Sequence, residues 1–433
     1  MDRRNFISQA GKVALGTAAL SLFPNVSAAS SIDDLVQNKS KGVFPFGEPV
    51  KVEFPTFPLV TESVPNYGPQ GLSGVRIKGI QAYAVMGTPV EDNRLLSEFV
   101  EYRDTADPRK KEIKRDLVLV DLSNGRALNL SAPLVDRVRQ ASPEVKWLGV
   151  LNQYDLHGDN VVLTPGLERT PGVYPGKYDP NSSKVFRINL ATSEITRVSK
   201  TEAGNVKLAD DLVVFEGGNT ELYARNLDLQ RRLYTLSKGL NGGNFIEHVG
   251  ENFAIFNNPV GVTRNGRVDG PYGGTDMRDN QLFYADLEAI KGGVAEEKAR
   301  RPLTPRSQHT QEFLHIVDGS LLYAQNNPGA GRWDYYVSDL KTGVSRPLSK
   351  DELAELLVEK RGIAFETRDE DRKNGVTSLH FRTKGMKSYV PLSDPAEHSG
   401  ALKYLKGNKV LFNGSARGPD DKRTVWLYVL DLK

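Results

Sequence analysis

A short pattern of alternating apolar and polar residues recurs along the chain. Each copy ends in Asp or Asn and is followed by Leu. An alternation with a period of two is typical of β-strands. Six copies lie at 117–122, 185–190, 222–227, 282–287, 335–340 and 427–432. The last interval, from Asp339 to Asp431, is 92 residues, and 378–382 fills it as a degraded seventh copy.

A second pattern follows most copies after about ten residues: a small residue or proline, then Leu or Val, then Ser or Thr. The last strand ends one residue before the C-terminus, so no seventh copy of the second pattern can follow it. Pro58-Leu59, within 50–60, is the missing member. The second pattern occurs at 129–131, 197–199, 235–237, 302–304, 347–349 and 391–393.

Seven such units predict an all-β fold, a seven-bladed β-propeller over residues 50–433. A single blade cannot bury both of its faces, whereas a closed ring of blades can. We expect the N-terminal strand at 50–60 to complete the C-terminal blade and close the ring. A run of unrelated β-sandwiches is the alternative, but it does not explain the displaced seventh copy.

Smaller signals add detail within the blades. Two hairpins are predicted, 313–316 with 321–325 and 402–405 with 409–413, each joined by a Gly-containing turn. Ser349 and Glu352 have the spacing of a capping box. They predict a short helix inserted before the sixth blade.

The first residues have the pattern of an export signal. Arg3-Arg4 is followed by an apolar run over 13–23, which is too short to span a bilayer, and by the small residues of 26–28. We interpret 1–28 as a twin-arginine (Tat) signal peptide and 29–49 as an N-terminal linker. This predicts a periplasmic or secreted protein with no membrane span after cleavage. A basic N-terminal helix is the alternative.

Composition excludes several classes of function. The 433 residues are 39% hydrophobic and 26% charged, which is typical of a globular protein, and the net charge of +3 gives no case for a nucleic-acid partner. There are no cysteines, so disulfides, thiolate metal sites and cysteine nucleophiles are excluded. A quinone- or copper-dependent redox propeller is disfavoured by only six scattered histidines.

The connections between the second and third strands of the blades are long, polar and rich in Gly and Pro, whereas the first turns have two or three residues. In a propeller these long connections gather on one face around the channel mouth, where binding residues concentrate on loops. Tolerated insertions are the alternative. The long connections are 87–114, 164–183, 258–280, 326–332, 368–375 and 414–423.

Two of the six histidines, His309 and His398, occupy equivalent places just before the first strands of blades five and seven. Both are predicted to point toward the channel mouth, where they could bind a divalent metal or transfer protons. Hydrogen bonding to loop carbonyls is the alternative. The nearby candidates for a third ligand are Gln308, Gln311, Asn327 and Glu397. His157, His248 and His315 lie next to turns and are interpreted as structural, and His380 as packing.

Four arginines in these loops, Arg264, Arg267, Arg332 and Arg417, could clamp a carboxylate through two hydrogen bonds each. Solvated loop charges are the alternative. Trp333 and Tyr272 are candidates for stacking on a sugar ring, or for packing.

Blades five and seven resemble those of TolB-type propellers, and more specifically of the oligogalacturonate lyase family. The residues that carry the resemblance are His309-Thr310 with 321–323, and His398 with 410–415. The resemblance implies a seven-bladed propeller, a divalent metal (Mn or Ca) held by His309 and His398, and carboxylate binding by Arg332 or Arg417. The family has a further histidine two places after each of these. Here Gln311 and Gly400 stand there.

The leading hypothesis is therefore a monomeric exported propeller that binds or cleaves an acidic oligosaccharide or polysaccharide at one face. If it is an enzyme, the reaction is a metal-assisted β-elimination, with His309 and His398 as catalytic residues and Gln311 as a third metal ligand. The rival is a non-catalytic binding or scaffold propeller for a protein or glycan of the cell envelope.

Overall fold

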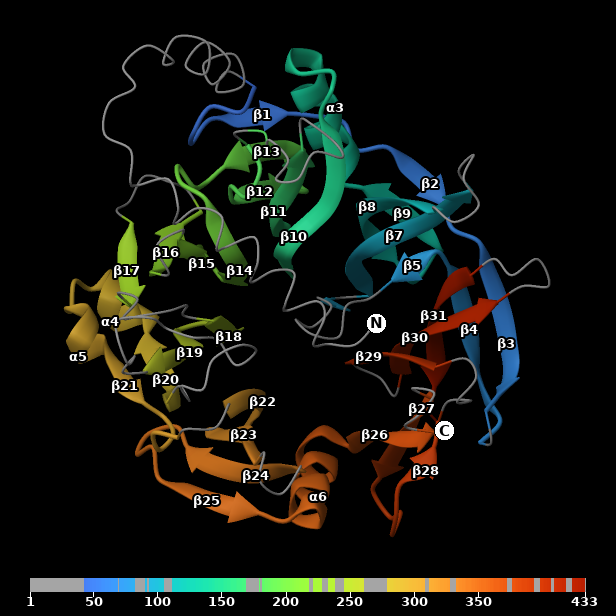
Figure 1. The fold of residues 1–433 in the computed structure, drawn as a ribbon, viewed down its shortest axis with the longest axis vertical. Coiled ribbons are helices and arrows are strands. Elements are labelled where there is room, and N and C mark those ends of the chain that lie inside the picture. Colours follow the sequence, from blue (N-terminus) through green and yellow to red (C-terminus); the bar gives the residue numbers. More distant parts are fainter. Residues whose placement is uncertain are drawn as a thin grey trace.

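Seven small antiparallel sheets stand in a ring in the computed structural model, so the predicted seven-bladed β-propeller is confirmed (Figure 1). The structure describes residues 43–432 apart from 69, 82–89, 92, 105–110, 169–178, 180, 218–220, 228–232, 238–244, 261–278, 308–310, 328–331, 372–375, 393–397, 406–408 and 418–422. Among the described residues, no helix combines the length and apolar character needed to cross a bilayer.

Blade five has the regular four strands. They are β22 (Gln311–Val317), β23 (Ser320–Asn327), β24 (Arg332–Asp339) and β25 (Ser345–Leu348), paired in chain order. The first turn, Asp318-Gly319, has positive φ at both residues (46° and 74°), as a two-residue hairpin turn requires.

The recurring Asp ends the third strand for a physical reason. The Asp339 carboxylate accepts hydrogen bonds from the backbone N–H groups of Lys341 and Thr342 at 2.9 and 2.7 Å, which fixes the next turn. These bonds favour the charged form and lower the pKa of Asp339. The Leu340 N–H donates to Gly319 O at 2.9 Å, which joins the two turns of the blade.

Blades one to four follow the same plan. In blade one the strands are β5 (Ile80–Gln81), β6 (Val90–Glu91), β7 (Arg94–Asp104), β8 (Lys111–Asp121) and β9 (Arg126–Asn129), followed by helix α3 (Ser131–Ala141). Blade two has β10 (Lys146–His157), β11 (Asn160–Glu168), β12 (Phe186–Asn189) and β13 (Glu194–Arg197). Blade three has β14 (Ala203–Ala209), β15 (Leu212–Gly217), β16 (Leu222–Asn226) and β17 (Tyr234–Ser237). Blade four has β18 (Phe245–Val249), β19 (Phe253–Val260), β20 (Asp279–Asp286), helices α4 (Leu287–Lys291) and α5 (Glu296–Ala299), and β21 (Arg300–Pro302).

Blade six has three strands in its described part: β26 (Ile363–Asp371), β27 (Val376–Thr383) and β28 (Val390–Pro391). The degraded repeat at 378–382 lies in β27, as predicted. β26 pairs with β27 in the same way as the second strand of blade five, β23, pairs with the third, β24. β26 is therefore the second strand of blade six. Helix α6 (Lys350–Arg361), which begins at the predicted capping box, therefore stands in the chain where the other blades have their first strand.

An N-terminal strand closes the ring, as predicted, but it is not the predicted one. Blade seven contains β29 (His398–Leu405), β30 (Lys409–Arg417) and β31 (Arg423–Asp431), followed in space by β4 (Leu72–Lys78) and β3 (Thr61–Tyr67). Pro58 lies instead in β2 (Thr56–Pro58), which pairs with β9 of blade one. A proline has no N–H to donate, which suits this outer edge better than a strand between two partners.

The N-terminal segment wraps around the outside of three neighbouring blades. β1 (Pro49–Lys51) adds a fifth strand to blade two, β2 extends blade one, and β3 extends blade seven (Figure 1). Phe44, at the end of the predicted linker, is fully buried with its ring edge-on to Phe186 at 5.3 Å. Residues 43–49 of that linker thus belong to the packed structure, while residues 1–42 lie outside the described part.

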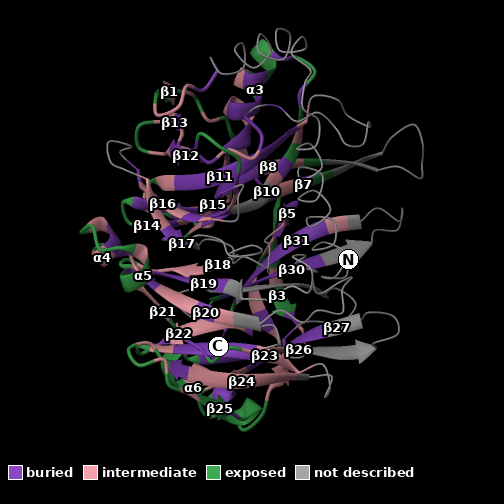
Figure 2. Cartoon of the chain, turned by 60° about the vertical axis from the view of Figure 1, so that its left-hand side comes forward, coloured by how far each residue is buried: buried purple, intermediate pink, exposed green. Residues whose placement is uncertain are grey.

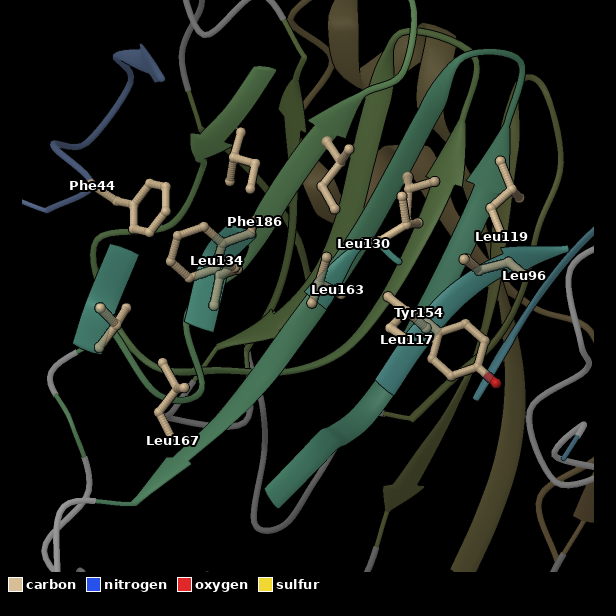
Figure 3. Close-up of a cluster of buried hydrophobic side chains, with 14 of the residues drawn as sticks. Phe44, Leu96, Leu117, Leu119, Leu130, Leu134, Tyr154, Leu163, Leu167 and Phe186 are labelled. Carbon is tan, nitrogen blue, oxygen red and sulfur yellow. The ribbon is translucent and has the colours of Figure 1, made fainter. Parts of the chain in front are cut away.

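The core lies within and between the blades rather than at one centre. Strand interiors are buried, and exposure is concentrated at turns and at helices such as α4 and α5 (Figure 2). One cluster joins α3 and Phe44 to blades one and two, with Leu117, Leu134 and Leu163 inside it (Figure 3). Another joins Ile77 and Leu427 of blade seven to Leu95 of blade one across the closure. Each blade is therefore stabilised by its neighbours.

Candidate functional site

The backbone brings several predicted residues to one face of the ring. His398 begins β29 and Arg332 begins β24, while Arg417 ends β30. These positions lie at the end of their blades where the second strand connects to the third. Arg332 pairs with Asn327 at the end of the second strand of blade five, and His398 pairs with Gly414 near the end of the second strand of blade seven. The side chains of His398, Arg332 and Arg417 are outside the described part of the structure, so their roles stay predictions.

Some of the other predicted site residues lie outside the described part of the structure, and others lie within it. His309, Arg264, Arg267 and Tyr272 lie outside the described residues, as do most of the long connections. Trp333 is half-buried as the second residue of β24, opposite Asn326. Its position at the same edge is compatible with stacking and with packing alike.

Gln311 is a buried residue, 1% exposed, and its amide is already engaged. The amide oxygen accepts from the Thr304 hydroxyl at 2.6 Å, and the amide nitrogen donates to Pro305 O at 2.9 Å. Its backbone carbonyl accepts from the Asn257 side chain of blade four at 2.9 Å. A metal bound by this amide would share its oxygen with the Thr304 hydroxyl. Within the described residues, no three or more His, Asp or Glu side chains are grouped closely enough to hold a metal.

The other four histidines have protein contacts of the kind expected of structural residues. His248 stacks on Phe313 of blade five at 5.2 Å, and His315 contacts Arg361 of helix α6. The His380 ring is buried, 2.8 Å from the Ser378 hydroxyl.

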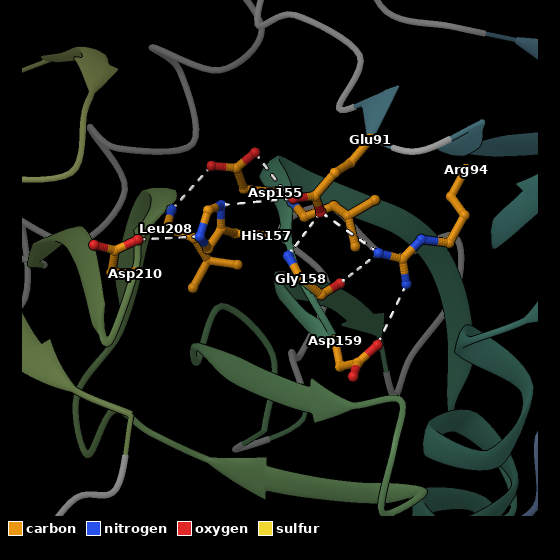
Figure 4. Close-up of polar contacts among 9 residues, drawn as sticks. Glu91, Arg94, Asp155, His157, Gly158, Asp159, Leu208 and Asp210 are labelled. Atoms are coloured by element: carbon orange, nitrogen blue, oxygen red, sulfur yellow. Dashed lines mark hydrogen bonds and ion pairs between the residues drawn. The ribbon is translucent and has the colours of Figure 1, made fainter.

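His157 belongs to a polar network at the opposite face of the ring (Figure 4). Its Nε2 lies 3.1 Å from an Asp210 oxygen in blade three. On its other side, Arg94 of blade one donates to Gly158 O at 3.0 Å and lies 3.4 Å from Asp159, while Glu91 accepts from the Gly158 N–H at 2.7 Å. The network links the first turns of blades one, two and three. Because most of these side chains are half-exposed, we expect the network to add little to the free energy of unfolding. Its role is to orient the three blades relative to one another.

A recurring polar position on the second strands was not found from the sequence. Glu98, Glu216 and Asn257 each pair with the first Leu of the repeat, in blades one, three and four. Each reaches the first strand of the next blade. Glu98 and Glu216 accept from the Val150 and Ile246 N–H groups at 3.4 and 3.3 Å, and Asn257 donates to Gln311 O. These side chains therefore hold the inner strands of neighbouring blades together.

Glu216 differs from Glu98 in having no cationic partner among the described residues. An Arg115 nitrogen lies 3.1 Å from the Glu98 carboxylate. The Glu216 carboxylate instead accepts from the Asn205 amide at 2.7 Å and from Ile246 N–H. Burial raises the pKa of Glu216 to about 8, and the two hydrogen bonds only partly offset this. Glu216 is therefore a group that can give or take a proton near neutral pH, between the innermost strands of blades three and four.

Comparisons with known proteins show likeness in fold alone. No protein-family model matches the chain, and no curated protein matches it. Among solved structures, an oligogalacturonate lyase from Vibrio parahaemolyticus is 11% identical, with a TM-score of 0.49, over 87% of this chain and 98% of that one. TolB from Acinetobacter baumannii is 12% identical, with a TM-score of 0.31, over 78% and 80%. BamB from Moraxella catarrhalis is 10% identical, with a TM-score of 0.34, over 88% and 98%. Both kinds of propeller that the sequence resembled are among these structures.

Proposed function

We propose that the face formed by the connections between second and third strands binds an acidic oligosaccharide or polysaccharide. The charge of the two faces carries this proposal. The seven connections contain eleven Lys and Arg residues against seven Asp and Glu, a net charge of +4. On the opposite face, the first turns and the connections between third and fourth strands contain eight Lys and Arg against ten Asp and Glu, a net charge of −2. Such an asymmetry steers an anionic polymer to one face.

The residues at this face have the chemistry that uronate sugars require. Arg332 and Arg417 can each bind a carboxylate through two hydrogen bonds, as can Arg264 and Arg267. His398 supplies an imidazole that is a base or a hydrogen-bond donor near neutral pH. In this proposal the aromatic ring of Trp333 stacks on a sugar face.

Binding is tested with a panel of uronate-containing polysaccharides and their carboxyl-reduced counterparts. We expect the acidic forms alone to bind, because the reduced forms offer no carboxylate to arginine. Arg332→Ala and Arg417→Ala are each expected to weaken binding about tenfold, measured by titration calorimetry at constant salt. The matched control is Lys341→Ala, which removes an exposed charge from a turn at the opposite face. Equal binding of the reduced forms, or undiminished binding in both arginine variants, would contradict the proposal.

Catalysis is the second part of the same test. β-Elimination produces an unsaturated uronate, whose absorbance can be followed on the same panel with Mn or Ca present. We assign no step to a metal, because His309 and the side chain of His398, the predicted ligands, lie outside the described part of the structure. An unsaturated product that is lost in His398→Ala would make the protein a lyase. Binding without product would make it a carbohydrate-binding propeller.

The proposal places the protein outside the cytoplasm, where such polymers occur. Its support is the Arg3-Arg4 pair, the short apolar run and the small residues of 26–28. Cleavage near Ala28 would leave every described element in place, because the described part begins at Val43.

A further inference from the structure

Phe46 lies among four cationic side chains between blades two and three. Its backbone bridges to Arg197 at the end of β13, and the next residue, Gly47, donates its N–H to Arg197 O at 3.0 Å. The Lys200 ammonium nitrogen lies 4.9 Å from the centre of the Phe46 ring, and the Arg225 guanidinium carbon lies 5.0 Å from it. Lys184 is the fourth cation, close enough to Arg197 for their charges to repel. We call Phe46, Lys184, Arg197, Lys200 and Arg225 the Phe46 cluster.

The positive charge of the Phe46 cluster is poorly compensated. Within the described part of the chain, no acidic side chain forms an ion pair with Arg197, Lys200 or Arg225. The charge of Glu202 acts favourably on Lys184. Burial lowers the pKa values of Lys184, Arg197 and Arg225, because the protein has removed part of their water without supplying a counter-charge.

Two hydrogen-bond donors of the cluster are also unsatisfied. The Nε–H groups of Arg197 and Arg225 are buried and have no acceptor in the part of the chain that the structure describes. Neighbouring Arg187 shows the ordinary arrangement, since it donates to Asn160 at 2.8 Å and to Leu227 O at 3.0 Å. Buried donors without partners are rare in folded proteins, because each one costs free energy. A bound anion would both neutralise the positive charge of the cluster and accept hydrogen bonds from its free N–H groups.

We propose that the Phe46 cluster binds a tetrahedral oxyanion, a phosphate or sulfate group. Such a group accepts several hydrogen bonds from arginine and lysine at once, and it neutralises their charge. Arg197 and Arg225 belong to neighbouring blades, so a bound oxyanion bridges the two, with Phe46 of the N-terminal segment beside it. Lys184 lies in the connection between the second and third strands of blade two and so borders the carbohydrate face, but the proposed site does not depend on the function of that face.

The test is the unfolding temperature of the protein in increasing inorganic phosphate or inorganic sulfate, compared with sodium chloride of equal ionic strength. We expect a saturating rise of about 3 °C or more with the oxyanion. Lys200→Ala is expected to weaken the apparent affinity about tenfold, and Arg225→Ala at least as much. Lys200 is exposed, so its variant folds even if the Arg225 variant does not. Lys341→Ala, which removes an equally exposed lysine from blade five, is expected to bind as the unaltered protein does.

A sulfated polymer such as dextran sulfate separates the two sources of an oxyanion. A response to the small ions identifies a free ion as the ligand, and a response to the polymer alone identifies an ester group. Either response supports the proposal if Lys200→Ala diminishes it while Arg332→Ala and Arg417→Ala do not. No stabilisation beyond that of chloride would overturn it, as would an undiminished response in Lys200→Ala. Neither result bears on binding of uronates.

Discussion

A Gly74→Val variant is expected to lose most of the stability of the fold. Gly74 lies in β4 opposite Leu430 of β31, where the ring closes. A Cβ atom here would overlap the backbone oxygen of Val429 and stand 2.8 Å from the Leu430 Cα. Backbone atoms of a central strand cannot move aside, so the two strands must separate. We expect a loss of about 4 kcal/mol or more in the free energy of unfolding, measured by denaturant titration.

The control for this variant is Gly292→Ala at the end of helix α4. Its φ of −70° is one that alanine adopts readily, and the added Cβ would lie 3.3 Å from Ala289 O. We expect a change of less than about 1 kcal/mol there. If Gly74→Val unfolded at the same denaturant concentration as the unaltered protein, β4 could not be the closing strand.

Glu216→Gln is expected to stabilise the protein increasingly as the pH rises. The folded-state pKa of about 8 is above the ordinary value of 4.5. The stability that protonated Glu216 contributes to the fold is therefore fully present below about pH 4.5 and is lost as the pH rises through about 8. Glutamine remains neutral and keeps an oxygen for Asn205 and Ile246. The variant should gain roughly 2–4 kcal/mol over the unaltered protein at about pH 9, and little at about pH 5. The measurement is the free energy of unfolding across that range.

Glu98→Gln is the matched control for the alkaline effect. Glu98 has the equivalent place in blade one, but its carboxylate lies 3.1 Å from Arg115. Glutamine there removes the negative charge beside a cation, so this variant should be less stable at every pH between about 5 and 9. A stability difference of Glu216→Gln that did not change with pH would show that the carboxyl group is not buried as described.

The ring could be predicted from the sequence because its units repeat. In four blades the third strand ends at a carboxylate or amide that accepts a hydrogen bond from the backbone of the next turn, at Asp121, Asn189, Asp286 and Asp339. The same local physics therefore leaves similar residues in these blades. The capping box at Ser349 and Glu352 is equally local, and it identified α6. The sequence did not predict that α6 takes the place of a first strand. A capping box indicates where a helix begins, but it carries no information about the sheet beside the helix.

The closing strand was assigned to the wrong segment for a related reason. Pro58-Leu59 copies the residues of a fourth strand, and it does lie next to one, since β2 pairs with β9. The strand that closes the ring, β4, contains Gly74 and does not carry the repeat at its end, where the other fourth strands have it. Its place is determined by its contact with Leu430 and by the burial of Ile77 at the closure, both of which depend on residues more than 300 positions away.

Side chains that act between blades were not found from the sequence. The sequence places Glu216 at the end of an ordinary strand, and only its burial in the folded ring raises its pKa. The Phe46 cluster joins residues from four segments, each with an unremarkable charge. His309, His398 and the loop arginines were recognisable because the long connections are visible in the sequence, and their roles stay predictions.

A cysteine pair across the closure tests the central claim, that β4 and β31 complete the ring. The chain has no cysteines, so Val75→Cys with Val429→Cys gives one possible disulfide, between residues that face each other in the register. We predict rapid formation of this disulfide in the folded protein, detected after proteolysis as a link between the terminal fragments that a reductant breaks. Val50→Cys with Val429→Cys, which represents closure by 50–60, should form none, because Val50 pairs with Ile195 of blade two. A disulfide in the second pair and none in the first would contradict the closed ring as described.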